Sequence, residues 1–115
     1  MGMNLLKEIL SELEGLKLRD SVVYNAGGKS ILADYFIVVT SESTVQMEAS
    51  RQRLIALLKG SQKKLKNPLE EWQGGWCLLD FGDIIIHIML DEMRSFYNLD
   101  GLFQGAGYQL EKKSA

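Results

Sequence analysis

The stretch Tyr35-Phe36-Ile37-Val38-Val39-Thr40 decides the fold, and the polar segment Ser41-Glu42-Ser43-Thr44 follows it directly. The first stretch is aromatic and β-branched and almost wholly apolar, which is typical of a central strand covered on both faces. Ser43 and Gln46 have the spacing of a capping box, and an apolar stripe then continues to a stop at Gly60. A buried strand therefore leads into a helix of about four turns, which opens a βα unit.

Further strands and helices are predicted on both sides of this unit. Residues 76–81 and 84–90 form two strands, and the two residues Gly82 and Asp83 between them predict a hairpin. Leucines at helical spacing predict a first helix between Asn4 and Gly15, and a strand follows at residues 20–25. Asp91 is expected to cap a last short helix, with an apolar anchor at residues 99–103.

This order of elements predicts the fold class and the extent of the domain. We expect an α/β (α+β) fold with a single mixed β-sheet of four to five strands and helices packed against it. Residues 1–104 are expected to form a single domain. Residues 105–115 are polar and contain glycine, and are expected to form a flexible C-terminal tail.

Composition excludes several classes of function. The 115 residues carry a formal charge of −2 and are 46% hydrophobic, which argues against disorder and against binding held mainly by phosphate contacts. One cysteine and one histidine exclude an intramolecular disulfide and a multi-cysteine or multi-histidine metal site. The sequence shows neither a signal-peptide core nor a transmembrane run, so we expect a cytoplasmic protein, or an organelle-matrix one if a transit sequence was lost.

The predicted hairpin contains the residues best suited to a metal site or to acid–base chemistry. Asp80 and Asp83 could hold a hard cation such as Mg²⁺, and the spacing of Asp83 and His87 could place both on one face of a strand. The structural interpretation is favoured, because Asp and Gly82 suit a tight turn and a lone histidine on an apolar strand is usually packed in the core. Gly28-Lys29-Ser30 resembles the end of a phosphate-binding loop, but Val23 occupies the position of the required glycine.

Other candidate residues leave their alternatives open. Cys77 is expected to pack in the core rather than act as a nucleophile. Arg94 and Tyr97 share a helix face, either as a surface pair or as part of a recognition patch. Tryptophans 72 and 76 flank a Gly-Gly turn and are equally suited to anchor an interface or to cover the core edge. Four lysines between residues 59 and 66 are read as a solvated helix end, with an anionic partner as the alternative.

Three segments carry a resemblance to a known family: Ala33-Asp34-Tyr35-Phe36-Ile37-Val38-Val39-Thr40, Trp76-x-x-x-Asp80-x-Gly82-Asp83-x-x-x-His87, and Arg94-Ser95-Phe96-Tyr97-x-Leu99-x-x-Leu102-Phe103. Together they resemble the ribosomal silencing factor (Iojap) family over residues 4–103. The chain departs from the family pattern in three places: residues 41–46 lack a basic residue, Leu69-Glu70-Glu71 lacks a glycine, and Phe103 replaces a tryptophan.

The resemblance implies a function and a set of site residues. Members of the family bind a large-subunit ribosomal protein, number fourteen, and sterically block joining of the small and large subunits, which represses translation when nutrients are scarce. Their fold is similar to nucleotidyltransferases, and they tend to form homodimers. The positions that the resemblance marks for partner binding are Trp76, Asp80, Gly82, Asp83, His87, Arg94 and Tyr97.

We therefore expect a translation repressor that is not an enzyme and needs no cofactor or metal. The expected partner is the large ribosomal subunit through a ribosomal protein, with a secondary contact to ribosomal RNA through residues 59–66 and no membrane contact. The alternative is a small nucleotidyltransferase-like enzyme that uses Asp80, Asp83 and a metal. A third possibility, a dimeric regulator of the toxin–antitoxin kind, has no positive support in the sequence.

Overall fold

The computed structural model describes residues 3–67 and 74–113. The elements are α1 (Met3–Gly15), β1 (Arg19–Asn25), β2 (Tyr35–Ser41), α2 (Thr44–Gly60), β3 (Trp76–Asp80), β4 (Ile84–Leu90), α3 (Asp91–Tyr97), α4 (Leu99–Gly105) and β5 (Gln109–Lys113). The five described strands form one mixed sheet in the order β3-β4-β2-β1-β5, in which β2 and β4 are parallel and the other neighbours antiparallel. The predicted fold class is confirmed.

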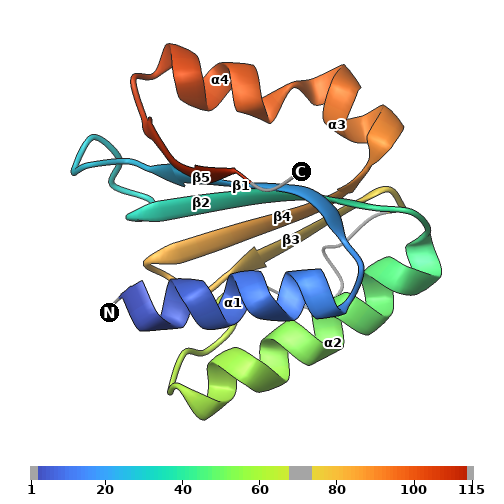
Figure 1. Ribbon diagram of the computed structural model, residues 1–115. Coiled ribbons are helices and arrows are strands. Elements are labelled where there is room, and N and C mark those ends of the chain that lie inside the picture. Colours follow the sequence, from blue (N-terminus) through green and yellow to red (C-terminus); the bar gives the residue numbers. More distant parts are fainter. Residues whose placement is uncertain (1–2, 68–73, 114–115) are drawn as a thin grey trace.

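Helices cover both faces of the sheet, with α1 and α2 on one side and α3 and α4 on the other (Figure 1). Ile37 and Val39 of β2 are buried in the core that α1 and α2 cover. Phe36 and Val38 point to the opposite face, where Phe103 of α4 packs on them. The residues of β2 therefore alternate between two apolar cores, as an apolar central strand requires.

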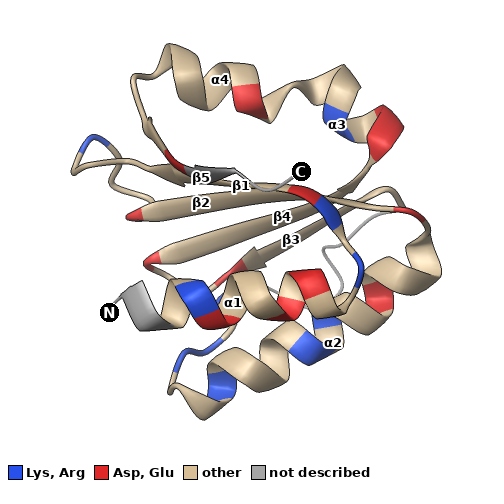
Figure 2. Cartoon of the chain, in the orientation of Figure 1, with Lys and Arg blue, Asp and Glu red and all other residues tan. Residues whose placement is uncertain are grey.

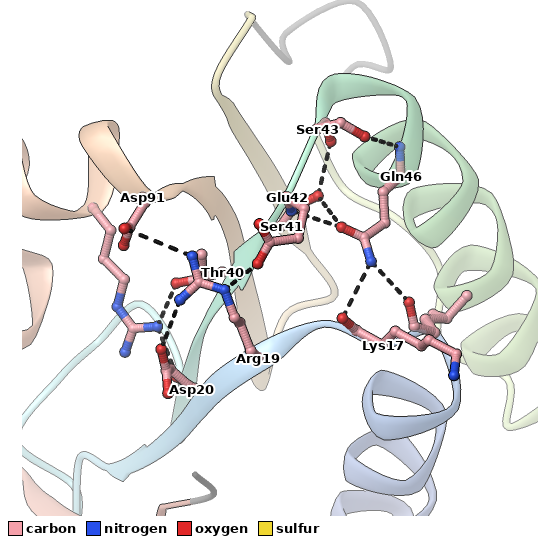
Figure 3. Close-up of polar contacts among 11 residues, drawn as sticks. Lys17, Arg19, Asp20, Thr40, Ser41, Glu42, Ser43, Gln46 and Asp91 are labelled. Atoms are coloured by element: carbon pink, nitrogen blue, oxygen red, sulfur yellow. Dashed lines mark hydrogen bonds and ion pairs between the residues drawn. The ribbon is translucent and has the colours of Figure 1, made fainter.

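The start of α2 confirms the predicted capping signal in a modified form. The Ser43 hydroxyl accepts a hydrogen bond from the Gln46 N–H at 3.1 Å. The Gln46 side chain accepts from the backbone N–H of Glu42, not of Ser43, so the box closes one residue early. Its amide also donates to the carbonyl oxygens of Leu16 and Lys17, which ties the end of α1 to the start of α2 (Figure 3).

The prediction of a flexible tail is wrong for residues Gln109–Lys113, which form β5 and pair with β1. Without this strand β1 would leave a row of unpaired backbone groups at the edge of the sheet. Tyr108 directs the chain there, because its ring stacks on Phe36 and Phe103 with centroids 5.5 and 5.7 Å away. A mixed polar strand of this kind has no strong sequence signal of its own.

The predicted hairpin of β3 and β4 is confirmed, and the Phe81 N–H donates to the Ile84 carbonyl across Gly82 and Asp83. The predicted cap of α3 is wrong in detail, because the N-cap is Leu90 and no side chain caps it. Among the described helices, none combines the length and the apolar character needed to cross a bilayer.

Candidate partner-binding site

The structure divides the seven predicted site residues among three places. Trp76, His87 and Tyr97 lie together near the start of β3. Asp80, Gly82 and Asp83 belong to the hairpin turn, at the opposite end of β3 and β4. Arg94 belongs to a polar network beneath α3 and α4. The sequence motif is therefore continuous along the chain but does not form a single site.

The first group forms a ladder of aromatic rings that leads from the core to solvent. Trp76 and Tyr97 have ring centroids 4.9 Å apart, and Phe96 meets Tyr97 edge-on at 5.0 Å. Exposure rises outward, because Tyr97 is 49% and Phe96 79% exposed while Trp76 is partly buried. We call Trp76, Phe96 and Tyr97 the aromatic surface. Exposed aromatic rings fixed by their neighbours are typical anchors of protein interfaces.

His87 supports this surface from below. It is 6% exposed, and its Nδ1 accepts a hydrogen bond from the Trp76 indole N–H at 3.1 Å. Burial lowers the pKa of His87 to about 4, so the ring is neutral near pH 7 and Nε2 carries its proton. The interpretation of His87 as a packed core residue is confirmed, and its contact fixes the orientation of the Trp76 ring.

Arg94 joins α3 and α4 to the sheet. Its Nε and Nη2 donate to the two carboxylate oxygens of Asp100 at 3.0 and 3.2 Å. Its Nη1 donates to the Asp20 carbonyl at 2.7 Å and to the Thr40 hydroxyl at 3.0 Å. Tyr24 of β1 donates a hydrogen bond from its hydroxyl to the Asp100 carboxylate at 2.5 Å. With its side chain 13% exposed, Arg94 is a structural residue and not the outer partner of Tyr97.

The same network shifts the pKa values of Asp100 and Tyr24. Burial opposes the charge on Asp100, but the hydrogen bonds from Arg94 and Tyr24 outweigh it and lower the pKa of this carboxyl. Burial, together with the bond to Asp100, raises the pKa of Tyr24 to about 12. Asp100 is therefore a half-buried carboxylate whose charge is balanced by Arg94 and hydrogen-bonded by Tyr24.

The carboxylates of the hairpin also have internal partners. Asp80 accepts from the Gly82 N–H at 2.9 Å, and Asp83 accepts from the Lys63 ammonium at 2.8 Å. The second oxygen of Asp83 is buried and has no hydrogen-bond partner among the residues that the structure describes. The interpretation that places Asp83 and His87 on one face of a strand is wrong, because Asp83 lies in the turn before β4 and pairs with Lys63 in the turn after α2. No group of three or more His, Cys, Asp or Glu side chains in the described chain could hold a metal ion.

Two further predictions concern residues beside the aromatic surface. Cys77 is fully buried, and burial raises the pKa of its thiol to about 12, which confirms its place in the core. Trp72, the partner of Trp76 across the Gly-Gly turn, lies outside the described residues, as does the Leu69-Glu70-Glu71 segment.

The segment at residues 41–46, which departs from the family pattern, lies in a polar network that sequence reasoning missed. Arg19 of β1 brings a guanidinium to this end of the sheet and pairs with Glu42, with Asp20 at 3.0 Å and with Asp91 at 3.6 Å (Figure 3). Asp20 is the sequence neighbour of Arg19, but Glu42 and Asp91 lie far from it along the chain, so no local spacing could have revealed those two contacts. Asp100 and Tyr24 were missed for the same reason, since 76 residues separate them.

Comparison with known proteins supports the resemblance. The sequence model of the family described as "Ribosomal silencing factor during starvation" matches residues 3–115. A ribosomal silencing factor from Zymomonas mobilis is 33% identical over 99 residues, which cover 86% of this chain and 74% of that protein. A mouse protein named "Mitochondrial assembly of ribosomal large subunit protein 1" is 29% identical over 83% of this chain and 43% of that protein. A crystal structure of a Chromobacterium violaceum protein superposes with a TM-score of 0.81 at 25% identity, covering 100% of this chain and 94% of the other.

Proposed function

The chain belongs to the ribosomal silencing factor family, and on that premise we propose that it represses translation by binding the large ribosomal subunit. The partner on that subunit is ribosomal protein fourteen, and the bound chain sterically prevents the small subunit from joining. The chain acts in the cytoplasm, where the subunits are, and is a homodimer when free. The name of the mouse relative, which refers to the large subunit, supports the choice of subunit.

The aromatic surface is the observation that carries this proposal. Phe96 and Tyr97 expose large apolar rings to solvent, and the hydration of this apolar surface is unfavourable in free energy unless a partner covers it. The bond between His87 and Trp76 and the contact between Trp76 and Tyr97 hold the rings in place before binding. A preorganised aromatic anchor loses little side-chain entropy on binding, so it suits a protein that acts by occupying a surface.

The geometry of the hairpin favours a repressor over a nucleotidyltransferase. Metal-dependent phosphoryl transfer needs carboxylates that converge on one ion. Asp80 instead accepts from a backbone N–H of its own turn, and Asp83 pairs with Lys63. Both carboxylates therefore bind groups of this chain, Asp80 within its own turn and Asp83 in the turn after α2.

The test is co-sedimentation with isolated large subunits at physiological salt, together with an assay of subunit joining. We expect the wild-type chain to sediment with large subunits and to inhibit joining, and Tyr97→Ala to weaken binding at least tenfold, because loss of an interface anchor costs about 2 kcal/mol. Leu110→Ala is the matched control, since Leu110 is similarly exposed at 45% but lies on β5. Wild-type protein that stays in the supernatant would contradict the proposal.

Ribosomal protein fourteen is tested separately, by binding the purified protein to the same variants. Light scattering of the free chain measures its oligomeric state. If Tyr97→Ala binds large subunits as tightly as Leu110→Ala does, the aromatic surface is not the contact.

A further inference from the structure

We propose that a hollow at the hairpin end of the sheet is a second binding site, which holds the phosphate backbone of RNA. This inference rests on the proposed function, because the large subunit would present the RNA. The hollow has a volume of about 630 Å³ and lies between the turn that follows α2, the hairpin of β3 and β4, and the loop before β2. Its lining includes three lysines, two exposed apolar residues and two carboxylates: Lys63, Lys64, Lys66, Ile31, Leu32, Asp80 and Asp83. Lys63 pairs with Asp83, which leaves Lys64 and Lys66 as the lysines offered to an anion.

The turn after α2 concentrates positive charge in a chain of net charge −2. Four lysines stand between residues 59 and 66, and no acidic residue interrupts them. Figure 2 shows these basic positions along the end of α2 and the following loop, with the acidic positions of α1 on a neighbouring helix. Lys64 and Lys66 are exposed, and neither has an ion pair among the described residues. Their charges are available to an external anion.

The hairpin places these lysines. Asp83 holds the Lys63 ammonium at 2.8 Å, and the Lys66 N–H donates to the Asp80 carbonyl at 2.6 Å. Asn67 continues this attachment, because its side chain bonds the Leu78 carbonyl at 2.8 Å and the Asp80 N–H at 2.9 Å. The loop is thereby held along β3 through Lys63, Asn67 and the Lys66 backbone, while the side chains of Lys64 and Lys66 stay exposed.

Gly82 provides the space for the Lys66 side chain. Its φ of +95° is unfavourable for other residues, and a Cβ there would lie 3.0 Å from Lys66 Cε and 3.2 Å from Nζ. The Lys66 side chain thus lies over the hairpin backbone. The Asp-x-Gly-Asp sequence of the hairpin is explained here as support for a basic site and not as a metal site.

The exposed lysines and the apolar wall of the hollow favour RNA over an acidic protein. Lysine ammonium groups are compact charges that neutralise backbone phosphates, and binding of this kind needs no base-specific geometry. Ile31 is fully exposed and Leu32 is 68% exposed, so the wall beside the lysines offers apolar contact to sugars and unstacked bases. β3 and β4 separate this hollow from the aromatic surface by roughly 17 Å, the length of a five-residue strand. One large subunit could therefore occupy both surfaces.

The experiment measures binding of a fluorescein-labelled RNA hairpin to the full chain by anisotropy over a series of salt concentrations. Lys64→Gln with Lys66→Gln is compared with Lys7→Gln with Lys17→Gln, a control that removes the same charge near α1. The lysine-loop variant should bind about tenfold more weakly at low salt. Its slope of log affinity against log salt should fall by about 2, since each lost phosphate contact removes about 0.9. The control should match wild type.

Several results would overturn the inference. These are equal binding by the lysine-loop variant and the control, no binding of the hairpin by wild type at low salt, or equal displacement of the RNA by polyglutamate at matched charge. The last result would indicate an acidic protein partner. Tyr97→Ala separates the two proposals, because it should lose large-subunit binding and keep hairpin binding. If wild type binds the hairpin through these lysines but not the large subunit, the proposed function fails and the RNA site stands.

Discussion

Replacing Arg94 by methionine should destabilise the fold strongly, even though arginine is usually a surface residue. The substitution keeps much of the side-chain volume and removes four hydrogen bonds, two of them to the Asp100 carboxylate. The two side chains are 13% and 22% exposed, so Asp100 would be left as a largely desolvated charge with only Tyr24 as a side-chain donor. Breaking one partner of a buried pair costs about 3–5 kcal/mol, and the partial exposure places our expectation near the lower end, at about 3 kcal/mol.

The assay is urea unfolding followed by tryptophan fluorescence at pH 7. A loss of about 3 kcal/mol corresponds to a melting temperature lower by roughly 12 °C in a domain of this size. Arg53→Met is the control, because Arg53 pairs with Glu12 at 2.8 Å but is 65% exposed, and such a pair contributes less than about 1 kcal/mol. Asp100→Asn, alone and combined with Arg94→Met, completes a double-mutant cycle, with a coupling of about 2 kcal/mol expected.

The pH dependence gives a second readout of the same network. The pKa of Asp100 is lowered in the folded chain, so its contribution to stability is present above its unfolded value of about 4 and is lost as pH falls through the folded value. In Arg94→Met this acid-side loss should shrink. A variant whose unfolding free energy stays within about 0.5 kcal/mol of wild type would refute the reasoning, since that is the range of ordinary surface substitutions.

Three further predictions follow from single contacts. Burial lowers the pKa of His87 to about 4, so the folded chain keeps this ring neutral at pH values where the unfolded chain protonates it. Up to about 3 kcal/mol of unfolding free energy should therefore be lost as pH falls from 6.5 to 4. His87→Gln should flatten that part of the curve of stability against pH. Gly82→Ala should cost about 1–2 kcal/mol by thermal unfolding, because of its positive φ and its contact with Lys66, whereas Gly15→Ala, with open space around it, should not destabilise the chain. Cys77 should react with a thiol reagent at the rate of unfolding, and fast labelling of the native chain would contradict its burial.

Local pattern was sufficient for most of the secondary structure. Apolar periodicity located α1, β2 and β4, and the two-residue spacing predicted the hairpin at Gly82. The tail prediction failed because β5 forms by completing the edge of β1, and an edge strand is decided by its neighbour more than by its own residues. The cap of α3 failed because β4 runs into that helix without a turn in which Asp91 could act as a cap.

In the candidate site, too, some features follow from the sequence alone and others depend on the tertiary structure. The sequence by itself determined the family, the two-sided burial of β2, and the residue types at the hairpin and the last helices. Only the tertiary structure decided what those residues do: Tyr97 reaches solvent, His87 holds Trp76, and Arg94 is used inside the fold. The physical reason is that hydropathy and turn preference act over a few residues. Exposure and polar pairing depend on residues far apart in the sequence, such as Tyr24 and Asp100 at a separation of 76 residues, which only the packed sheet brings together.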